Sequence, residues 1–238
     1  MSQLSDLIED LVTANRILAK QGIVDTFGHV SVRHPNNPKR FLLSRARAPE
    51  RVETADIMEF TLESEPVDAK GRKPYVERFI HGAAYEARSE VMSVVHNHSP
   101  GVIPFGVTAG KLKPIMHTCA TIGHEVPIWD QRKKFGDTDL LVSNMAMGRD
   151  LAKALGKGRT SLMRGHGCVV VGPSLRAAVF TAVYLEVNAK LQMQAEARGK
   201  VKFLSKGEVD KITAATNDVW LNRAWENWCR AADRPYRE

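Results

Sequence analysis

The chain has 238 residues, of which 43% are hydrophobic and 26% are charged, and its formal net charge is +7 at pH 7. These values are ordinary for a globular domain and exclude a disordered or collagen-like chain, while three scattered cysteines exclude a disulfide framework. The basic residues are dispersed rather than gathered in a tract, which favours a small anionic substrate over nucleic acid. No apolar run of membrane-spanning length and no leader-like N-terminus is present, so we expect a cytoplasmic protein without a membrane partner.

Hydrophobic spacing in the first half of the chain alternates between the helical and the strand period. Apolar residues recur first at three- and four-residue steps and then in short β-branched runs divided by a Pro-Asn-Asn-Pro turn. The predicted elements are a helix from Leu4 to Gly22, strands at 28–33 and 41–44, a helix at 76–89, and a strand at 92–95.

The second half begins with a less regular stretch, 104–140, and is then mainly helical. Glycines, serine caps and a Ser-x-x-Glu capping box delimit its helices. The predicted elements are a helix from near Thr138 to Gly156 or Gly158, a strand at 168–171, a helix from Ser174 to Gly199, and a last helix that starts at Ser205 and carries Trp220, Trp225 and Trp228. Alternating helices and strands predict one α/β domain over residues 1–238, with a C-terminal helical segment at about 205–232.

Three histidines are spaced as candidate metal ligands. His96 and His98 lie two apart at the end of a strand-like run, where side chains share a face. His166 lies between two glycines ahead of another strand-like run, and glycine lets the backbone approach an ion closely. Three imidazoles with an open position form a catalytic kind of site. The alternative is that His96 and His98 are strand histidines held by ordinary hydrogen bonds.

The order of these motifs resembles the class II aldolase/adducin family. The resemblance rests on the Gly-His-Val-Ser-Val-Arg run at 28–33, on Glu77 with His81, on His-Asn-His-Ser at 96–99 and on Gly-His-Gly at 165–167. It covers roughly residues 5–200. It implies a three-layer α/β/α sandwich on a largely antiparallel central sheet, assembled as a homotetramer with metal sites near the subunit interfaces.

The resemblance also assigns the ligands of the ion. His96, His98 and His166 would bind one divalent cation per subunit, and Glu77 would be the fourth ligand or an acid/base. The donor set admits zinc, manganese, iron or cobalt. His81 would be a hydrogen-bonding partner behind these ligands or a packed helix histidine, and without the resemblance Glu77 would be read as a solvated helix glutamate.

Other positions depart from the sugar-phosphate members, which hold phosphate with small hydroxyls. His29 replaces an asparagine, a loop from Leu43 to Pro49 replaces a Thr-Pro-x-Gly loop, and Tyr75 lies where serines precede the glutamate. The substitutions predict another anion. Planar guanidinium groups suit carboxylates, so the expected substrate-binding residues are Arg45, Arg47, Ser44 and Tyr75. The alternative for both arginines is a pair of solvated loop charges.

The substitutions are similar to a branch that decarboxylates hydroxylated aromatic or pyridine carboxylic acids, such as dihydroxyphthalate. This resemblance implies a metal-dependent carbon–carbon lyase whose enolate-like intermediate is stabilised by the ion. Glu77 and His29 are the candidate proton donors, ahead of His117 and His124. Two alternatives stay open, an aldolase or epimerase acting on an unphosphorylated hydroxy-keto acid or ketose, and a non-catalytic adducin-like interaction module. The C-terminal residues Trp220, Trp225 and Arg223 either complete the pocket or belong to a packing helix.

Overall fold

A mixed sheet forms the centre of the computed structural model, which describes residues 3–237. Within these residues the strand order is β3-β2-β1-β4-β7-β6-β5, and all neighbours are antiparallel except the parallel pair β5 and β6. The strands are β1 (His29–Arg33), β2 (Arg40–Ser44), β3 (Ile57–Thr61), β4 (Ser93–Asn97), β5 (Ile128–Trp129), β6 (Thr160–Met163) and β7 (Gly167–Gly172).

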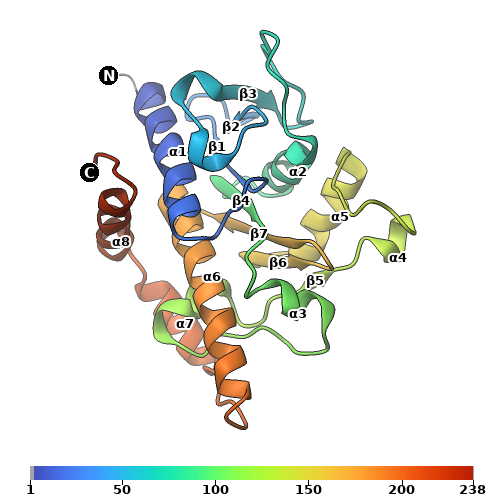
Figure 1. Cartoon of the computed structure of the whole chain (residues 1–238), viewed down its shortest axis with the longest axis vertical. Helices are drawn as coiled ribbons and strands as arrows, with labels where there is room; N and C mark the ends of the chain where they lie inside the picture. The colour runs from blue at the N-terminus through green and yellow to red at the C-terminus, as the bar shows by residue number, and fades with distance from the viewer. Residues whose placement is uncertain (1–2, 238) are drawn as a thin grey trace.

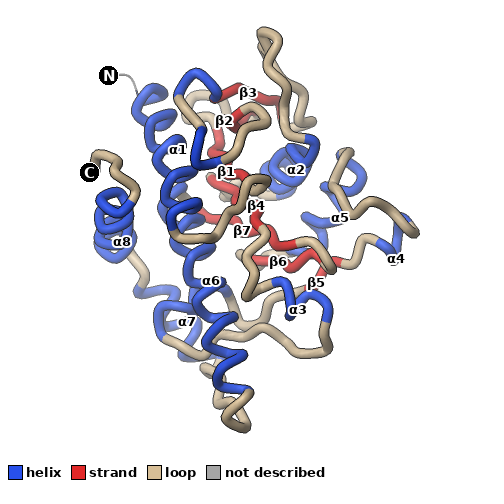
Figure 2. The backbone as a smooth tube through the Cα atoms, in the orientation of Figure 1, coloured by secondary structure: helices blue, strands red, loops and turns tan. Residues whose placement is uncertain are grey.

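Helices cover both faces of this sheet, which gives three layers (Figures 1 and 2). Helices α1, α6 and α8 lie on one face, and α2 and α5 lie on the other. The α-helices are α1 (Gln3–Lys20), α2 (Phe79–Ala87), α3 (Ile103–Val107), α4 (Arg132–Phe135), α5 (Met145–Leu155), α6 (Leu175–Glu196), α7 (Lys206–Ala215) and α8 (Asp218–Ala231). Short 3-10 turns are η1 (Pro49–Arg51), η2 (Thr54–Asp56), η3 (Val76–Arg78) and η4 (His117–Ile122). The predicted three-layer α/β/α fold on a largely antiparallel sheet is confirmed.

The central strands are buried on both faces because each face has its own hydrophobic core. Successive strand residues point to opposite faces. Val95 and Val170 therefore pack with α1 and α6, whereas Val94 and Val169 pack with α2 and α5. This double coverage explains why β4 and β7 are nearly continuous apolar runs in the sequence.

Several predicted boundaries are confirmed. Helix α1 ends just before Gly22, which has a φ of +66°. Ser174 caps α6 by accepting a hydrogen bond from the Ala177 N–H, and Gly156 ends α5. The capping box at Ser205 starts α7 as expected.

The structure corrects two predicted helix starts. The helix expected at 76–89 starts at Phe79, because the preceding turn is 3-10 and Glu77 has non-helical angles of φ −86° and ψ 19°. Glu77 thus precedes α2 and does not share a helix face with His81. The helix expected near Thr138 starts at Met145. Segment 138–144 is irregular instead: Leu140 has a φ of +66°, its carbonyl lies 3.0 Å from His166 Nδ1, and the Val142 N–H donates to Glu77.

The predicted last helix is two helices, and three strands were not predicted. Asn217 interrupts the helical pattern, since its side chain accepts hydrogen bonds from the N–H groups of Val219 and Trp220 and so starts α8. The tryptophans therefore lie on α8 and not on the helix capped by Ser205. Strands β5 and β6 have only two and four residues, and β3, although as long as β4, alternates with polar residues and lacks the apolar run that marks β4. None of the helices within residues 3–237 combines the length and apolar character needed to cross a bilayer.

Candidate metal centre

Three adjacent strands reach the same edge of the sheet at the candidate site. In the register of β1 and β4, His29 lies opposite His96, and in that of β4 and β7, Asn97 lies opposite Cys168. The start of β1, the end of β4 and the start of β7 therefore meet. Residues just before or after these strand ends, including His98 and His166, are brought together there.

The glycines around His166 allow this close approach. A Cβ atom at Gly167 would lie 2.2 Å from the carbonyl oxygen of Asn97 and 2.9 Å from Cδ2 of His98. No side chain fits in that space. Gly165 has a φ of +68°, a left-handed conformation that glycine adopts without strain. The Gly-His-Gly sequence is thus required by the backbone that presents His166.

Four side chains converge at this edge, namely those of Glu77, His96, His98 and His166. One ligand atom from each lies within 4.8 Å of all the others. His96 Nε2 is 3.1 Å from His98 Nε2 and 3.4 Å from Glu77 Oε2, and His166 Nε2 is also 3.4 Å from Glu77 Oε2. All four residues that the sequence assigned as ligands are therefore in one cluster.

Each of the three imidazoles is held by its Nδ1 atom. His96 Nδ1 lies 3.1 Å from the carbonyl oxygen of Cys168, and His166 Nδ1 lies 3.0 Å from that of Leu140. His98 Nδ1 lies 3.0 Å from the carboxylate of Asp25. Since these partners only accept hydrogen bonds, every Nδ1 carries a proton. In a neutral ring, the Nε2 atom is then left with a free lone pair that faces the cluster.

This donor set fits a divalent cation. Two ligand atoms at about 2.1 Å from one ion, at angles of about 90° to 110°, are roughly 3.0–3.4 Å apart. The measured separations of 3.1 and 3.4 Å lie in this range. Two lone pairs at 3.1 Å would repel each other without a cation between them. Histidines that donate their other N–H to a carbonyl or carboxylate are also typical of metal sites.

The electrostatics of the cluster favour an ionised carboxylate. Burial alone would raise the pKa of Glu77, but His96 and His166 hold it far below its usual value. Burial and the neighbouring His96 lower the pKa of His98, whereas the Glu77 carboxylate outweighs burial and raises the pKa of His166. Glu77 Oε1 also accepts a hydrogen bond of 3.0 Å from the Val142 N–H. The other carboxylate oxygen therefore remains directed at the histidines.

Comparisons with known proteins agree with this geometry. Residues 9–193 match the family described as class II aldolase and adducin N-terminal domain. The chain belongs to the class II aldolase and adducin family. Among curated members, decarboxylase tropJ of Talaromyces stipitatus is 31% identical over 95% of this chain and 94% of its own. The 3,4-dihydroxyphthalate decarboxylase of Arthrobacter keyseri is 26% identical over 92% and 91%.

Solved structures of the class II aldolase family share the fold. An aldolase II superfamily protein from Pseudomonas syringae has a TM-score of 0.81 at 20% identity, covering 98% of this chain and 94% of its own. L-fuculose 1-phosphate aldolase from Glaciozyma antarctica has a TM-score of 0.78 at 22% identity, covering 99% and 93%. The expected family and its similarity to the decarboxylase branch are thus confirmed.

The residues expected to bind substrate in this class II aldolase domain form one network, but its arginines already have a partner. Arg45 Nε and Arg47 Nη1 each lie 2.6 Å from an oxygen of Asp56, which is nearly buried. Ser44 donates a hydrogen bond of 3.2 Å to the Tyr75 hydroxyl, which in turn donates to the carbonyl of Arg47. Each guanidinium retains N–H groups that Asp56 does not bind, although Arg47 Nη2 also lies 3.8 Å from Glu53 Oε1. Asp56 was not predicted.

His29 lies between this network and the candidate ligands. Its ring centroid is 4.5 Å from that of Tyr75 and 5.1 Å from that of His96. His29 is 1% exposed, and burial together with the nearby imidazoles of His81 and His96 lowers its pKa well below the usual value. His29 is therefore a neutral imidazole beside the cluster.

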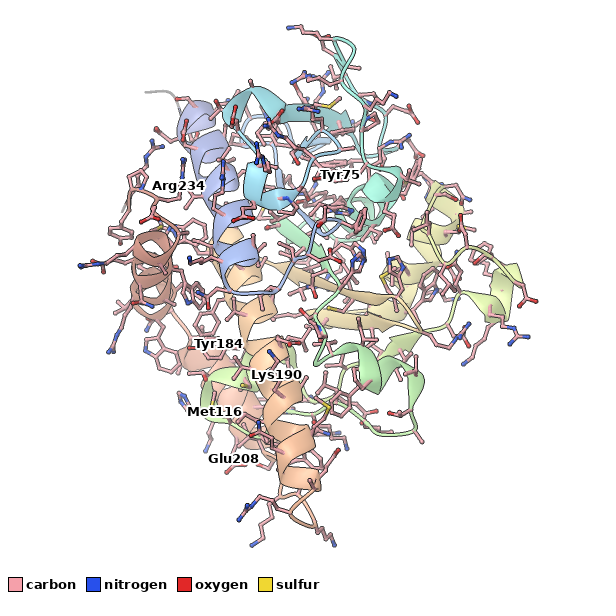
Figure 3. The ribbon with its side chains drawn as sticks, viewed as in Figure 1. Tyr75, Met116, Tyr184, Lys190, Glu208 and Arg234 are labelled. Atoms are coloured by element: carbon pink, nitrogen blue, oxygen red, sulfur yellow. The ribbon has the colours of Figure 1, made fainter. Side chains whose placement is uncertain are left out.

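The two less favoured proton donors have partners elsewhere. His117 packs on Trp220 of α8 with ring centroids 5.3 Å apart, and His124 lies 2.7 Å from Asp210 of α7. His117, Trp220 and Arg223 line a cavity of about 540 Å³ with aromatic residues of α6 and α8. This cavity is separate from the candidate site: Figure 3 shows Tyr184, which lines the cavity, and Tyr75, which lies beside His29, in different parts of the molecule. Neither histidine belongs to the Glu77 cluster.

Sequence reasoning missed four groups that orient the candidate ligands. Asp25 bonds to His98, and the backbone groups of Leu140, Val142 and Cys168 bond to His166, Glu77 and His96 in turn. Only Asp25 carried a sequence signal, because an aspartate at the start of an Asp-Thr-Phe-Gly turn commonly accepts the N–H groups that follow it. It does so here with Phe27 and Gly28.

Proposed function

We propose that this protein is a divalent-metal-dependent decarboxylase of a hydroxylated aromatic or heteroaromatic carboxylic acid. The observation that carries the proposal is the Glu77–His96–His98–His166 cluster flanked by the rings of His29 and Tyr75. Imidazole and phenol rings are better suited to contact a flat aromatic substrate than to contact a sugar phosphate. The names of tropJ and of the dihydroxyphthalate decarboxylase support the same reaction class.

Glu77, His96, His98 and His166 would hold the ion. When bound, a divalent cation supplies a Lewis acid that stabilises negative charge on neighbouring oxygen atoms. The ring carbon that bears the carboxylate must first take up a proton, and an ortho or para hydroxyl oxygen supports this step by supplying electrons to the ring. CO2 then leaves, and the electron pair of the broken carbon–carbon bond restores the aromatic ring.

Two of the chain's own residues are the candidates for handling this proton. The strongly lowered pKa of Glu77 keeps it ionised, which suits a ligand better than an acid. His29 is neutral and lies beside His96, so it can offer an N–H to the developing negative charge. We therefore favour His29 over Glu77 as the residue whose N–H donates a hydrogen bond to an oxygen atom of the substrate.

Arg45 and Arg47 would bind a carboxylate of the substrate through the N–H groups that Asp56 leaves free. Asp56 fixes both guanidinium groups in place and reduces their local positive charge. A fixed, partly neutralised pair favours a planar carboxylate held by directed hydrogen bonds over a more highly charged phosphate.

The deciding experiment measures CO2 release from ortho-hydroxylated benzene and pyridine carboxylates. Purified protein is assayed after chelation and after adding back manganese or zinc. We expect metal-dependent release that His96→Ala abolishes. His124→Ala is the matched control, since His124 pairs with Asp210 outside the cluster and its loss should leave turnover unchanged.

Other outcomes would replace the proposal. Cleavage of a hydroxy-keto acid or ketose without CO2 release would identify an aldehyde-lyase instead. A purified protein that binds no metal and turns over none of these compounds would fit an adducin-like interaction module.

We also propose that the protein is a homo-oligomer, a tetramer by its family resemblance. Sedimentation velocity would then give a mass four times the 26.4 kDa of the chain. A monomer at assay concentration would contradict this expectation.

A further inference from the structure

A row of four buried polar side chains extends from the candidate site into the interior. His29 Nδ1 lies 2.7 Å from His81 Nε2, and His81 Nδ1 lies 2.6 Å from Ser31 Oγ. Ser31 Oγ lies 2.7 Å from the Tyr85 hydroxyl. All four residues are at most 1% exposed. The row is therefore sealed from solvent except where His29 meets the site.

The geometry of a strand facing a helix produces this row. His29 and Ser31 are two apart on β1, and His81 and Tyr85 are four apart on α2. Two strand residues and one helical turn both span about 6 Å, so the pairs remain in step. The row is thus a consequence of how β1 and α2 pack.

The number of protons in the row determines in which direction its hydrogen bonds run. Ser31 and Tyr85 each bring one hydroxyl proton, and each neutral imidazole brings one N–H. If Tyr85 donates to Ser31, Ser31 to His81 Nδ1, and His81 Nε2–H to His29 Nδ1, every proton inside the row has an acceptor. Only the His29 Nε2–H, at the end of the row that meets the site, is left for another partner. The other polar group at the Tyr85 oxygen is the backbone N–H of Val94, which can only donate.

The reverse direction leaves a proton without a partner. If His29 donated to His81 and His81 to Ser31, the hydroxyl proton of Ser31 or Tyr85 would find no acceptor among residues 3–237. An unsatisfied buried donor is disfavoured by roughly five- to hundredfold in population. The first direction is therefore the stable one, and it leaves the proton of His29 on Nε2.

The Nε2 atom of His29 has no hydrogen-bond partner among the residues that the structure describes. We propose that His81 and Ser31 are positioning residues that hold His29 in its Nε2–H tautomer, so that this N–H is offered to a carboxylate or hydroxyl oxygen of the substrate. The inference rests on the proposed decarboxylase function for the identity of that substrate. The tautomer itself follows from the buried row alone.

The test reads the tautomer directly by ¹⁵N NMR of the zinc-loaded protein labelled at histidine. An unprotonated imidazole nitrogen resonates far downfield of a protonated one, and His29→Gln assigns the signals. We expect wild-type His29 to have an unprotonated Nδ1 and a protonated Nε2. In Ser31→Ala, the direction of the row is no longer fixed, so the signals should report a mixture of tautomers.

Two variants serve as controls. Tyr85→Phe should keep the wild-type tautomer, because the Ser31 hydroxyl proton still has His81 as its acceptor. Ser93→Ala removes another buried hydroxyl, one that donates to the Ser31 carbonyl outside the row, and should also change nothing. With a substrate in hand, Ser31→Ala should lower kcat several-fold while bound zinc stays at the wild-type level.

A protonated Nδ1 on wild-type His29, or a single unchanged tautomer in Ser31→Ala, would overturn the inference. If Ser31→Ala does not fold, the wild-type spectrum alone still decides the tautomer. Failure of the proposed function is distinguishable, because the expected spectrum would then be obtained with a protein that releases CO2 from none of the tested acids.

Discussion

Replacing Asp25 by asparagine should weaken metal binding about tenfold. Asp25 Oδ1 accepts the N–H groups of Phe27 and Gly28 at 2.8 and 3.1 Å, and both carboxylate oxygens lie close to His98 Nδ1, Oδ1 at 3.1 Å and Oδ2 at 3.0 Å. Asparagine can keep Oδ1, but its NH2 group would replace Oδ2 and face the N–H of His98, and the negative charge would be lost. Partners of this kind contribute roughly 10- to 100-fold to metal affinity. We take the lower end, about 1.4 kcal/mol, because the Asp25 side chain is 48% exposed.

The assay is competition for zinc against a fluorescent chelator at pH 7.5, with thermal unfolding as the check on folding. Asp210→Asn is the matched control, since Asp210 also pairs with a histidine, His124, at 2.7 Å but outside the cluster. An unchanged zinc affinity in Asp25→Asn would refute the reasoning. So would an equal loss in the Asp210→Asn control.

Three further perturbations probe the same edge of the sheet. Gly167→Ala would place a Cβ 2.2 Å from the Asn97 carbonyl and should lower the free energy of unfolding by about 3 kcal/mol, whereas Gly207→Ala, with open space around it, should be neutral or stabilising in urea denaturation. The pKa of His166 is raised, and a bound metal ion must displace the proton from this imidazole. Zinc affinity measured by competition should therefore fall as pH drops below that raised pKa, and protonation of His166 should no longer affect it at pH values well above that pKa. Asp56→Asn should destabilise the protein by about 1–2 kcal/mol at pH 7, because Arg45 loses its counterion and Arg47 keeps only the more distant Glu53, at 3.8 Å. Since the pKa of Asp56 is lowered on folding, that stabilisation exists above the unfolded value of 3.8 and should disappear as pH falls through the folded value, which acid titration of both proteins can check.

The clustering of the candidate ligands could be predicted because their chemistry and spacing are local signals. His96 and His98 lie at the end of an apolar run, and His166 lies between glycines that the backbone requires. The backbone groups that orient two of these side chains could not be predicted. The Leu140 carbonyl and Val142 N–H come from an irregular loop in which every residue type offers the same backbone groups.

The ion-pair partner of the two loop arginines could not be predicted for a similar reason. Arg45 and Arg47 suggested free guanidinium groups, but their partner Asp56 comes from a 3-10 turn whose position depends on the pairing of β2 with β3. The predicted extent of the last helix was wrong for a different reason. Thr216 and Asn217 interrupt a pattern that is otherwise helical on both sides, so only the cap geometry of Asn217 reveals two helices.

Because the candidate site forms only when β4 pairs with β7, a bound ion would indicate that the central sheet has folded. Asn97 and Cys168 contact each other although they are 71 positions apart, and the candidate ligands come from three separate segments of the chain. Contacts of such long range form late, because loop closure must precede them. An ion could therefore not nucleate the fold, and its binding energy would stabilise only chains whose central strands have already joined. Chelation should accordingly speed the opening of the middle of the sheet and leave the helical C-terminal segment unaffected.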